Sequence, residues 1–323
     1  MKLLIFFSLL SFSASAQLKW KNVDSLFQPL PSSVHVYMTN DSMYDGRPNI
    51  AYYVIADLKD KKLNFTTDTT FERRLTPSKF YERNDQPLLV VNCTFFEFSH
   101  YHNLNMVMRN GKVIAPNQQS IPLRGKDTLK YLHVFPSAIG ISKRREADVA
   151  WTYTGKKKKP IARQIPRIPF KDSINYITPE PRRRSFLPVE DFLNMYNRKW
   201  KMKTAVGGGP VLLQNSEIKI TNNEEHKFGG KAINDKHPRT AMGYTKDNKL
   251  IILVVQGRFP NLALGATLTQ EAQILKDLGC VEALNLDGGG SSCLLVNGKE
   301  TIKPSDKEGQ RPVPAVFMIT TKH

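Results

Sequence analysis

The segment 285–292 reads Asn-Leu-Asp-Gly-Gly-Gly-Ser-Ser and gathers chemically useful groups around three glycines. Asp287 supplies a carboxylate directly before the glycines, and Ser291 and Ser292 supply hydroxyls directly after them. Because glycine has no Cβ, the backbone at Gly288 and Gly289 can turn sharply and approach a ligand closely. The same composition is also typical of a tight strand-to-strand turn, so a turn and a site are both open interpretations.

Five further segments hold polar residues or glycines that hydrophobic periodicity does not require. Several of them lie at the ends of expected strands, where one rim of a sheet could gather them. A second glycine triplet, which includes Gly208 and Gly209, permits either a simple kink or a row of backbone N–H groups that faces an anion. The five segments are 92–97, 207–210, 237–241, 256–258 and 310–314.

Three of these segments hold side chains suited to catalysis or binding. Glu97 follows two aromatic residues, and an apolar pocket would raise the pKa of its carboxyl group toward the range used in acid–base catalysis. Arg239 stands at the entrance of an expected strand, where its guanidinium could bind phosphate or carboxylate, or simply lie at the surface. Asn92 ends a strand, a position where asparagine is commonly a turn residue.

Several familiar site types do not fit the sequence. The triplet before Ser291 lacks the following Lys-Ser/Thr pair of a P-loop, and Ser291 is not in a Gly-x-Ser-x-Gly elbow. The seven histidines lack the spacing of zinc ligands. Asp287 with backbone carbonyls could hold a hard divalent cation, but no segment resembles a calcium loop, and we expect no metal or other cofactor.

The N-terminus predicts export. Lys2 precedes an apolar run at 3–12, and Ala14-Ser15-Ala16 provides a small-x-small cleavage pattern. We expect a signal peptide at 1–16, cleaved near Ala16, and a periplasmic or secreted protein without stable membrane insertion, because no later segment is long and apolar enough to span a bilayer.

Short β-like runs dominate the mature sequence, and turn dipeptides separate them. Helices are expected at 188–200, weakly at 23–27 and 76–84, and most clearly from Thr267, where Thr267 and Gln270 form a capping-box pattern and Gly279 marks the end. The pattern predicts an α+β fold, with strand-rich mixed sheets and a few packed helices in a single large domain. Expected strands are 34–38, 50–58, 63–67, 88–92, 106–109, 139–142, 149–153, 205–207, 210–213, 240–245, 250–256, 281–286, 293–296 and 315–320.

The formal net charge is +18, and much of the positive charge lies between residues 143 and 203. The simplest interpretation of this stretch is a solvated insertion, and an electrostatic funnel for an anionic substrate is the alternative. A nucleic acid is disfavoured as the partner because the sequence contains no recognisable nucleic-acid-binding motif. The three cysteines are too few for a disulfide framework, so we expect at most one bridge and at least one buried thiol.

The ordered blocks resemble the phosphodiester glycosidase family from about residue 45 to the C-terminus. The matching blocks are Asn92-x-x-Phe95-Phe96, Gly207-Gly208-Gly209-Pro210, His237-Pro238-Arg239-Thr240-Ala241, Gly265-x-Thr267-Leu268, Leu286-Asp287-Gly288-Gly289-Gly290-Ser291-Ser292 and Arg311-Pro312-Val313. The resemblance implies a lead segment at 17–44 and one domain at 45–323 that contains the basic insertion 143–203. The family block Asn-Gly-Gly-Phe-Phe-Asp reads Asn-Cys-Thr-Phe-Phe-Glu here. The side chains that replace both glycines would leave less room for a substrate to approach this turn.

The resemblance implies an exported hydrolase that releases a sugar from a sugar-1-phosphodiester and leaves a phosphomonoester. Its catalytic carboxylate would be Asp287, with Glu97 as the second candidate, and Arg239 and Arg311 would be the phosphate-binding cations. The remaining matched positions would bind the substrate, with Asn92 on a sugar hydroxyl; they are Asn92, Gly208, Gly209, Thr240, Gly288, Gly289 and Ser291.

Two other functions remain open at the level of sequence. One is a glycosidase that acts on an acidic surface polysaccharide, with the basic stretch gripping the polymer. The other is a non-catalytic protein that binds anionic glycans. In each case the expected partner is a phosphorylated or acidic glycan and not a nucleic acid.

Overall fold

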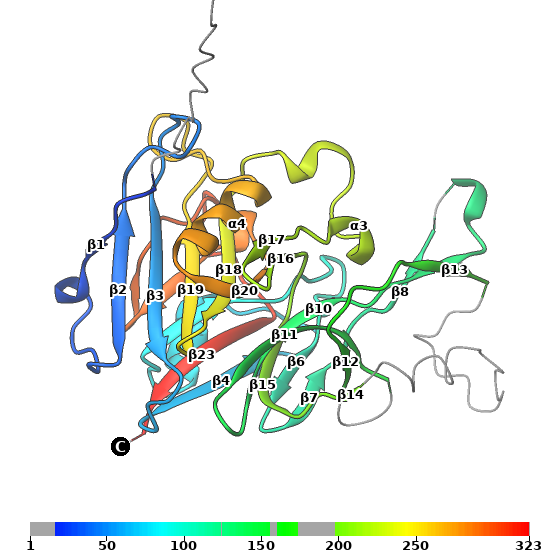
Figure 1. Cartoon of the computed structure of the whole chain (residues 1–323), viewed down its shortest axis with the longest axis horizontal. Helices are drawn as coiled ribbons and strands as arrows, with labels where there is room; N and C mark the ends of the chain where they lie inside the picture. Colours follow the sequence, from blue (N-terminus) through cyan, green and yellow to red (C-terminus); the bar gives the residue numbers. More distant parts are fainter. Residues whose placement is uncertain (1–16, 124, 156–159, 174–197, 323) are drawn as a thin grey trace, which may run out of the picture.

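The computed structural model describes residues 17–123, 125–155, 160–173 and 198–322, so the expected signal peptide lies outside the described residues. Strands dominate and helices are few and short (Figure 1). Among the described residues, the helices are α1 (Pro77–Arg83), α3 (Asn222–Glu225) and α4 (Leu268–Asp277), and the 3-10 turns are η1 (Asp24–Leu26), η2 (Gly125–Asp127), η3 (Gly230–Ile233) and η4 (Gly289–Ser291).

The largest sheet has eight strands and forms the left and centre of the view in Figure 1. It joins N-terminal strands to strands from the last third of the chain, and β3 pairs with β19 along its whole length. In spatial order the strands are β1 (Lys21–Asn22), β2 (Val34–Thr39), β3 (Ala51–Asp57), β19 (Lys249–Val255), β18 (Arg239–Thr245), β20 (Cys280–Asn285), β16 (Val211–Gln214) and β17 (Glu217–Ile218).

Three further sheets complete the fold. The seven-stranded sheet has the order β14 (Arg198–Lys199), β12 (Ile161–Arg163), β11 (Ala147–Tyr153), β10 (Ser137–Ser142), β15 (Met202–Gly207), β6 (Val107–Arg109), β7 (Lys112–Ala115). The five-stranded sheet has the order β22 (Lys299–Glu300), β21 (Leu294–Val296), β5 (Leu89–Asn92), β23 (Ala315–Thr321), β4 (Leu63–Thr69). The three-stranded sheet has the order β13 (Phe170–Asp172), β9 (Tyr131–His133), β8 (Ser120–Pro122).

The strand-rich prediction is confirmed, but the expectation of mixed sheets is wrong. Every strand pair among the described residues is antiparallel. The physical reason is the connectivity: parallel neighbours need long crossover connections, usually helical, whereas the described neighbours β2–β3, β10–β11 and β18–β19 follow one another directly along the chain.

The main hydrophobic core lies where three sheets meet. Val54 and Met242 come from the eight-stranded sheet, Val91 and Phe317 from the five-stranded sheet, and Trp151 from the seven-stranded sheet. All five side chains are buried. The part of the basic stretch 143–203 that the structure describes therefore contributes a core strand, β11, as well as exposed charged residues.

Helix α4 covers the opposite face of the eight-stranded sheet, where Leu268, Ala272 and Leu275 pack with Ala241 and Leu253 (Figure 1). The capping box predicted for this helix is present. Thr267 Oγ1 accepts from the Gln270 N–H at 3.1 Å, and Gln270 Oε1 accepts from the Thr267 N–H at 3.0 Å. Gly279 follows with φ +82°, a left-handed conformation that ends the helix at little steric cost.

The other helix predictions have different outcomes. Thr76 caps α1 as expected, while the segment expected at 23–27 forms only the 3-10 turn η1. Most of the helix expected at 188–200 lies outside the described residues, and the described Arg198–Lys199 is strand β14.

Candidate active site

Three separated sequence blocks meet at the side chain of Asn92, which ends β5. Its Nδ2 donates to the backbone carbonyl of Asp287 at 2.6 Å, and its Oδ1 accepts from Thr240 Oγ1 at 3.0 Å and from the Cys293 N–H at 3.1 Å. Asn92 and Thr240 are completely buried. Both side chains therefore hold the segment around Asp287 in place from the protein interior. Most of their hydrogen-bonding groups already have protein partners.

Asp287 lies between β20 and the glycine triplet, and the segment that follows β5 also holds its backbone. Its backbone N–H donates to the Cys93 carbonyl at 2.8 Å. Burial raises the pKa of its carboxyl group to about 6, and the Ser291 hydroxyl, the Arg311 charge, the Gly288 N–H and the Lys227 charge oppose this rise. A carboxyl group with such a pKa exchanges protons readily near neutral pH.

Lys227 is a buried cation that acts electrostatically on Asp287, and the sequence motifs do not single it out. Its Nζ donates to Asn105 Oδ1 at 3.2 Å and lies 4.6 Å from the centre of the Phe95 ring. Burial lowers the pKa of this ammonium group to about 8, while the charges of Glu225 and Asp287 oppose the decrease. Lys227 thus brings a positive charge into the electrostatic field of Asp287.

Glu225 anchors the turn that presents Lys227. Its buried carboxylate accepts hydrogen bonds from donors on β10, β11 and the segment around β16, so α3 is tied to two sheets. The donors are Ser137 N–H and Oγ, Trp151 Nε1, Val211 N–H and Thr221 Oγ1, at 2.6 to 3.3 Å. His226 follows with φ +50° and turns the chain toward the site.

The glycine triplet 207–209 does not present an anion-binding row of N–H groups. Its three N–H groups donate to the carbonyls of Met106, Ser137 and Asn285 at 2.7 to 3.0 Å. The glycines are needed for close packing: a Cβ on Gly208 would collide with the Asn285 carbonyl, and one on Gly209 would collide with Glu225 and Lys227. Gly208 and Gly209 therefore shape the site without donating to a ligand.

Two guanidinium groups cover the second glycine triplet. A Cβ on Gly289 would lie 2.9 Å from Arg258 Nη2, and a Cβ on Gly290 would collide with Arg311 and Asp306. Arg311 is half-buried and donates from Nε and Nη2 to the two carboxylate oxygens of Asp306 at 2.7 and 3.0 Å. The absence of Cβ atoms thus lets cations approach the backbone next to Asp287, as the glycine pattern predicts.

The structure does not bring the guanidinium of Arg239 to this cluster. Along β18, Thr240 points toward Asn92, and strand alternation sends its neighbour Arg239 to the opposite face, beneath α4. There Arg239 Nε donates to the Ala266 carbonyl at 2.8 Å and Nη2 donates to the Asp235 carbonyl at 3.0 Å. The structure thus gives Arg239 a role in anchoring the loops beside β18, and its expected phosphate-binding role stays a prediction.

Comparison with known proteins is consistent with this cluster. Residues 171–320, which contain both glycine triplets and Asp287, match the family model described as phosphodiester glycosidase. This chain resembles the phosphodiester glycosidases. The resemblance predicted from the ordered motifs is thereby confirmed.

Two curated relatives each match part of the chain. Over 120 residues the chain is 28% identical to the N-acetylglucosamine-1-phosphodiester alpha-N-acetylglucosaminidase of Mus musculus, which covers 37% of this chain and 22% of the relative. Over 74 residues it is 40% identical to the SPbeta prophage-derived uncharacterized protein YomE of Bacillus subtilis, which covers 23% of this chain and 11% of the relative. The matches thus span less than a quarter of each relative's length.

Solved structures share the fold. The zebrafish N-acetylglucosamine-1-phosphodiester alpha-N-acetylglucosaminidase catalytic domain superposes with a TM-score of 0.60 at 18% identity, covering 95% of this chain and 89% of that one. A hypothetical protein from Synechocystis superposes with a TM-score of 0.61 at 14% identity, covering 94% of this chain and 64% of that one. The phosphodiester glycosidase resemblance therefore extends to the arrangement of the sheets.

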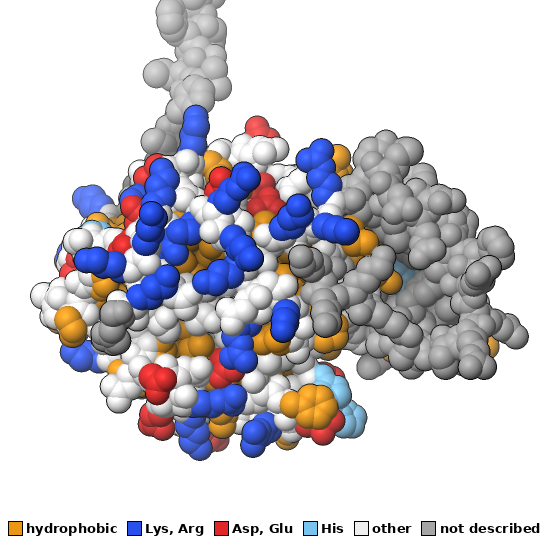
Figure 2. Space-filling model, turned by 90° about the horizontal axis from the view of Figure 1, so that it is seen from below, with side chains coloured by type: hydrophobic (Ala, Val, Ile, Leu, Met, Phe, Trp, Pro, Cys, Tyr) orange, Lys and Arg blue, Asp and Glu red, His pale blue; other side chains and the backbone are white. Residues whose placement is uncertain are grey.

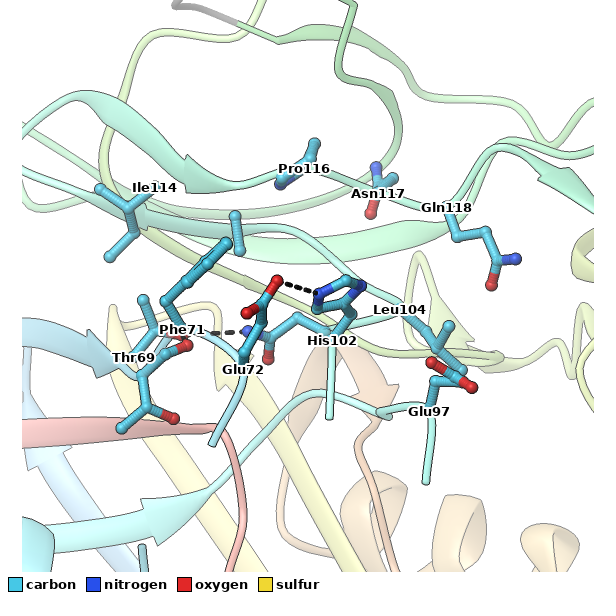
Figure 3. Close-up of a pocket in the computed structure, with 13 residues that line it drawn as sticks. Thr69, Phe71, Glu72, Glu97, His102, Leu104, Ile114, Pro116, Asn117 and Gln118 are labelled. Carbon is cyan, nitrogen blue, oxygen red and sulfur yellow. Dashed lines mark hydrogen bonds and ion pairs between the residues drawn. The ribbon is translucent and has the colours of Figure 1, made fainter. Parts of the chain in front are cut away.

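Glu97 lines a pocket whose lining residues do not include Asp287 (Figure 3). The prediction of a raised pKa is wrong, because hydrogen bonding to Ser99 and interaction with His100 lower the pKa of the exposed Glu97 carboxyl group. His100 Nδ1 lies 3.2 Å from Glu97 Oε2. The two aromatic residues before Glu97 do not enclose it, since Phe96 packs into a core cluster and Phe95 lies against Lys227.

The pocket beside Glu97 has a volume of about 520 Å³ and a mixed lining. Phe71, which is 78% exposed, lies opposite Ile114 and next to Glu72 and His102, whose Oε1 and Nε2 atoms are 3.6 Å apart (Figure 3). Asn103 also lines the pocket, and its Oδ1 accepts from Thr94 Oγ1 at 2.5 Å. Because Thr94 directly follows Cys93, this pocket adjoins the Asp287 segment through one short loop.

Among the described residues, no group of three or more His, Cys, Asp or Glu side chains is arranged to hold a metal ion. The three cysteines are free and buried, which confirms the expectation of buried thiols. Within the part of the chain that the structure describes, no helix is long and apolar enough to cross a membrane.

Proposed function

We propose that this protein is an exported hydrolase that breaks the bond between the anomeric carbon of a sugar and the phosphate of a sugar-1-phosphodiester. The products are the free sugar and a phosphomonoester. The observation that supports the proposal most directly is the placement of Asp287 within the fields of Lys227 and Arg311, at the glycine triplet that the family model matches.

The electrostatic demands of this reaction fit the cluster. Breaking the anomeric C–O bond develops positive charge on the sugar ring and negative charge on the departing phosphate. A carboxylate near the ring and cations near the phosphate therefore stabilise the transition state more than the bound substrate. Because a phosphomonoester leaves readily, protonation of the leaving group matters less here than in ordinary glycoside cleavage.

We assign each role by geometry and charge. The Asp287 carboxylate activates the attacking water or stabilises the sugar cation, and its pKa of about 6 keeps it largely ionised at neutral pH. Lys227 and Arg311 bind the phosphate oxygens, and Arg258 at the rim draws the anion inward. Ser291, which follows the triplet, orients the Asp287 carboxylate. Asn92 and Thr240 position the Asp287 backbone from beneath.

The pocket beside Glu97 is proposed to hold the part of the substrate beyond the scissile bond. Exposed aromatic faces such as Phe71 stack on apolar faces of sugars or other rings, while carboxylates and amides bind hydroxyl groups. The lining offers both, with Glu72, Glu97 and Gln118 among its polar side chains. Glu97 thereby becomes a binding residue rather than a second catalytic carboxylate.

A substrate screen tests the proposal. Residues 17–323 would be incubated with sugar-1-phosphate diesters that differ in sugar and in aglycone, with and without a chelator. We expect equimolar free sugar and phosphomonoester from at least one diester, in both conditions. Absence of both products from every diester would contradict the proposed reaction, and loss of product only with chelator would contradict the metal-independent form of it.

A further inference from the structure

A second pocket, of about 320 Å³, lies where the β3–β4 loop, the end of β10, the start of β15 and the C-terminal residues meet. We call it the basic pocket. Among its described lining residues none is acidic, and five carry positive charge: Lys61, Lys143, Arg145, Lys203 and Lys322. Phe65, Ile141, Ser142 and Thr204 complete the lining.

Arg145 lines the basic pocket, and several hydrogen bonds hold its guanidinium. Its Nε donates to the Leu58 carbonyl, and its Nη2 donates to the Asp60 carbonyl at 2.5 Å and to the Leu63 carbonyl at 3.0 Å. Its guanidinium also lies over the Phe65 ring, 5.3 Å from the ring centre. These partners are neutral, so they fix the guanidinium in place without cancelling its charge.

Lys203 adds a second fixed cation. Its Nζ donates to Asn64 Oδ1 at 3.0 Å, again a neutral partner. Burial lowers the pKa of Lys203, and the nearby positive charges of Lys322 and Arg145 lower it further. The cations of the basic pocket therefore repel one another, and a bound anion would relieve that repulsion.

The carboxylates nearest to Arg145 are already engaged by other residues. Asp57 lies 2.7 Å from Lys249 Nζ, on the neighbouring strand. Asp60 accepts from Ser33 Oγ at 2.5 Å and from the Lys62 N–H at 2.8 Å. Both carboxylates act electrostatically on Arg145. Neither lines the basic pocket, and two negative charges outside it offset only part of the five positive charges that line it.

The basic pocket and the Asp287 site lie at opposite ends of β23. Val316 near its start pairs with Asn92, whereas Thr321 at its end pairs with Leu63, and the following Lys322 N–H donates to the Lys62 carbonyl. A strand of seven residues spans roughly 20 Å. The C-terminus lies at the lower edge of Figure 1, and Figure 2, which views the molecule from below, shows many Lys and Arg side chains on that face.

From this geometry we propose that the basic pocket binds a phosphate group of a polyanionic glycan while another part of the same polymer reaches the Asp287 site. The phosphate chemistry follows from five clustered cations and the absence of acidic lining residues. Only the choice of a glycan as the carrier of the phosphate rests on the proposed function. The site would select polymers with repeated phosphodiester links over small diesters.

Binding measurements on full-length mature protein test this proposal, with a glycan of sugar-1-phosphate repeats, inorganic phosphate and polyglutamate as probes. The pocket variant carries Lys61→Gln, Lys143→Gln and Lys322→Gln. Its matched control carries Lys21→Gln, Lys79→Gln and Lys276→Gln, which change three exposed lysines elsewhere and give the same net charge. We expect the pocket variant to bind the glycan of sugar-1-phosphate repeats at least about 10-fold more weakly than the control at low salt.

Three outcomes would overturn the proposal. Equally weakened polymer binding in both triple variants would show a diffuse charge effect. Equal affinity of the wild-type protein for polyglutamate and for the phosphate polymer would show that the pocket does not recognise phosphate specifically. Equal affinity for inorganic phosphate and the polymer would assign the pocket to free phosphate.

Turnover of a small diester separates this proposal from the proposed function. The pocket variant should retain the wild-type kcat/KM on such a substrate, because none of its three lysines is placed at the Asp287 site. If no diester is cleaved by any variant while polymer binding still depends on the pocket lysines, the proposed reaction fails and the basic pocket is supported.

Discussion

Asp287 and Lys227 are charged together over a limited pH range because burial shifts their two pKa values toward each other. The pKa of Asp287 rises to about 6 and that of Lys227 falls to about 8. A carboxylate and an ammonium group held in one partly dehydrated site interact more strongly than they would in water. The proposed catalysis depends on both charges.

Replacing Asp287 by Asn tests the role of the carboxylate. The amide keeps the size of the side chain and the backbone contacts to Asn92 and Cys93, but it cannot activate water or stabilise a cation. We expect kcat to fall at least ~100-fold, the typical loss for such an electrostatic group. Asp85→Asn, a change at an exposed carboxylate with φ +55°, should leave kcat unchanged. Wild-type turnover in a folded Asp287→Asn variant would remove this residue from the mechanism.

The pH dependence of kcat/KM tests the pair. Activity should rise as Asp287 ionises through pH of about 6 and fall as Lys227 loses its proton through pH of about 8, which gives a bell-shaped profile. Lys227→Arg keeps the charge at all these pH values, so the alkaline limb should disappear below about pH 10. Lys276→Arg, at the exposed end of α4, should retain both limbs. An unchanged alkaline limb in Lys227→Arg would show that another group causes it.

At the scale of single elements, β18 and α4 separate what the sequence could predict from what it could not. The α4 boundaries follow from local rules, since Thr267, Gln270 and Gly279 act within their own segment. Strand alternation predicts that Arg239 and Thr240 point to opposite faces of the sheet. Which of the two points toward Asn92 depends on how β18 packs against α4 and β5, and no local sequence signal indicates it.

The other site residues follow the same division. The glycine triplets indicated close backbone approach, and in the structure a Cβ at Gly208, Gly209 or Gly290 would collide with neighbouring groups. Lys227 carried no comparable signal: it stands in a polar stretch after Glu225, and only its burial against Phe95 distinguishes it. Glu97 was misjudged because two adjacent aromatic residues do not reveal whether the next side chain points inward or outward.

Glu271 on α4 allows a stability test of the buried face beneath this helix. Burial raises the pKa of the Glu271 carboxyl group to about 8, and the Arg239 charge opposes the rise. The folded state therefore holds the proton more tightly than the unfolded state, whose ordinary value is 4.5. This contribution to stability is fully present below pH 4.5 and is lost as the pH rises through about 8.

Glu271→Gln removes that dependence. From pH 5 to pH 8.5 the wild-type free energy of unfolding should decrease by on the order of 2–4 kcal/mol relative to that of the variant. Urea unfolding at both pH values measures the difference, with Glu217→Gln, an exposed residue on β17, as control. A constant difference between wild type and Glu271→Gln would mean that Glu271 is not held protonated beneath the sheet.

At the scale of the whole molecule, the Asp287 site, the pocket beside Glu97 and the basic pocket lie along connected sheets and would together recognise a long substrate. Phe71 at the second of these positions is 78% exposed and is available for stacking. The sequence identified the positive charge that supports such recognition, but the basic stretch alone could not show that Lys203 and Arg145 meet Lys61 and Lys322, which are far apart along the chain.

Phe71→Ala tests the extended substrate. Loss of one stacking contact should raise KM roughly 3- to 10-fold for a diester with a long glycan aglycone and leave KM for a small diester unchanged. Leu129→Ala, which removes another highly exposed apolar side chain outside this pocket, should change neither value. Equal effects of Phe71→Ala on both substrates would place the aglycone elsewhere.

The position of bond cleavage tests the central claim most directly. Hydrolysis of a sugar-1-phosphodiester in ¹⁸O-labelled water, followed by mass spectrometry of the phosphomonoester, distinguishes attack at the anomeric carbon from attack at phosphorus. If Asp287 directs water to the sugar, the phosphomonoester released by the wild-type protein will carry no ¹⁸O. Incorporation of ¹⁸O into the phosphomonoester would show that the protein breaks the P–O bond, and it would contradict the proposed glycosidase chemistry.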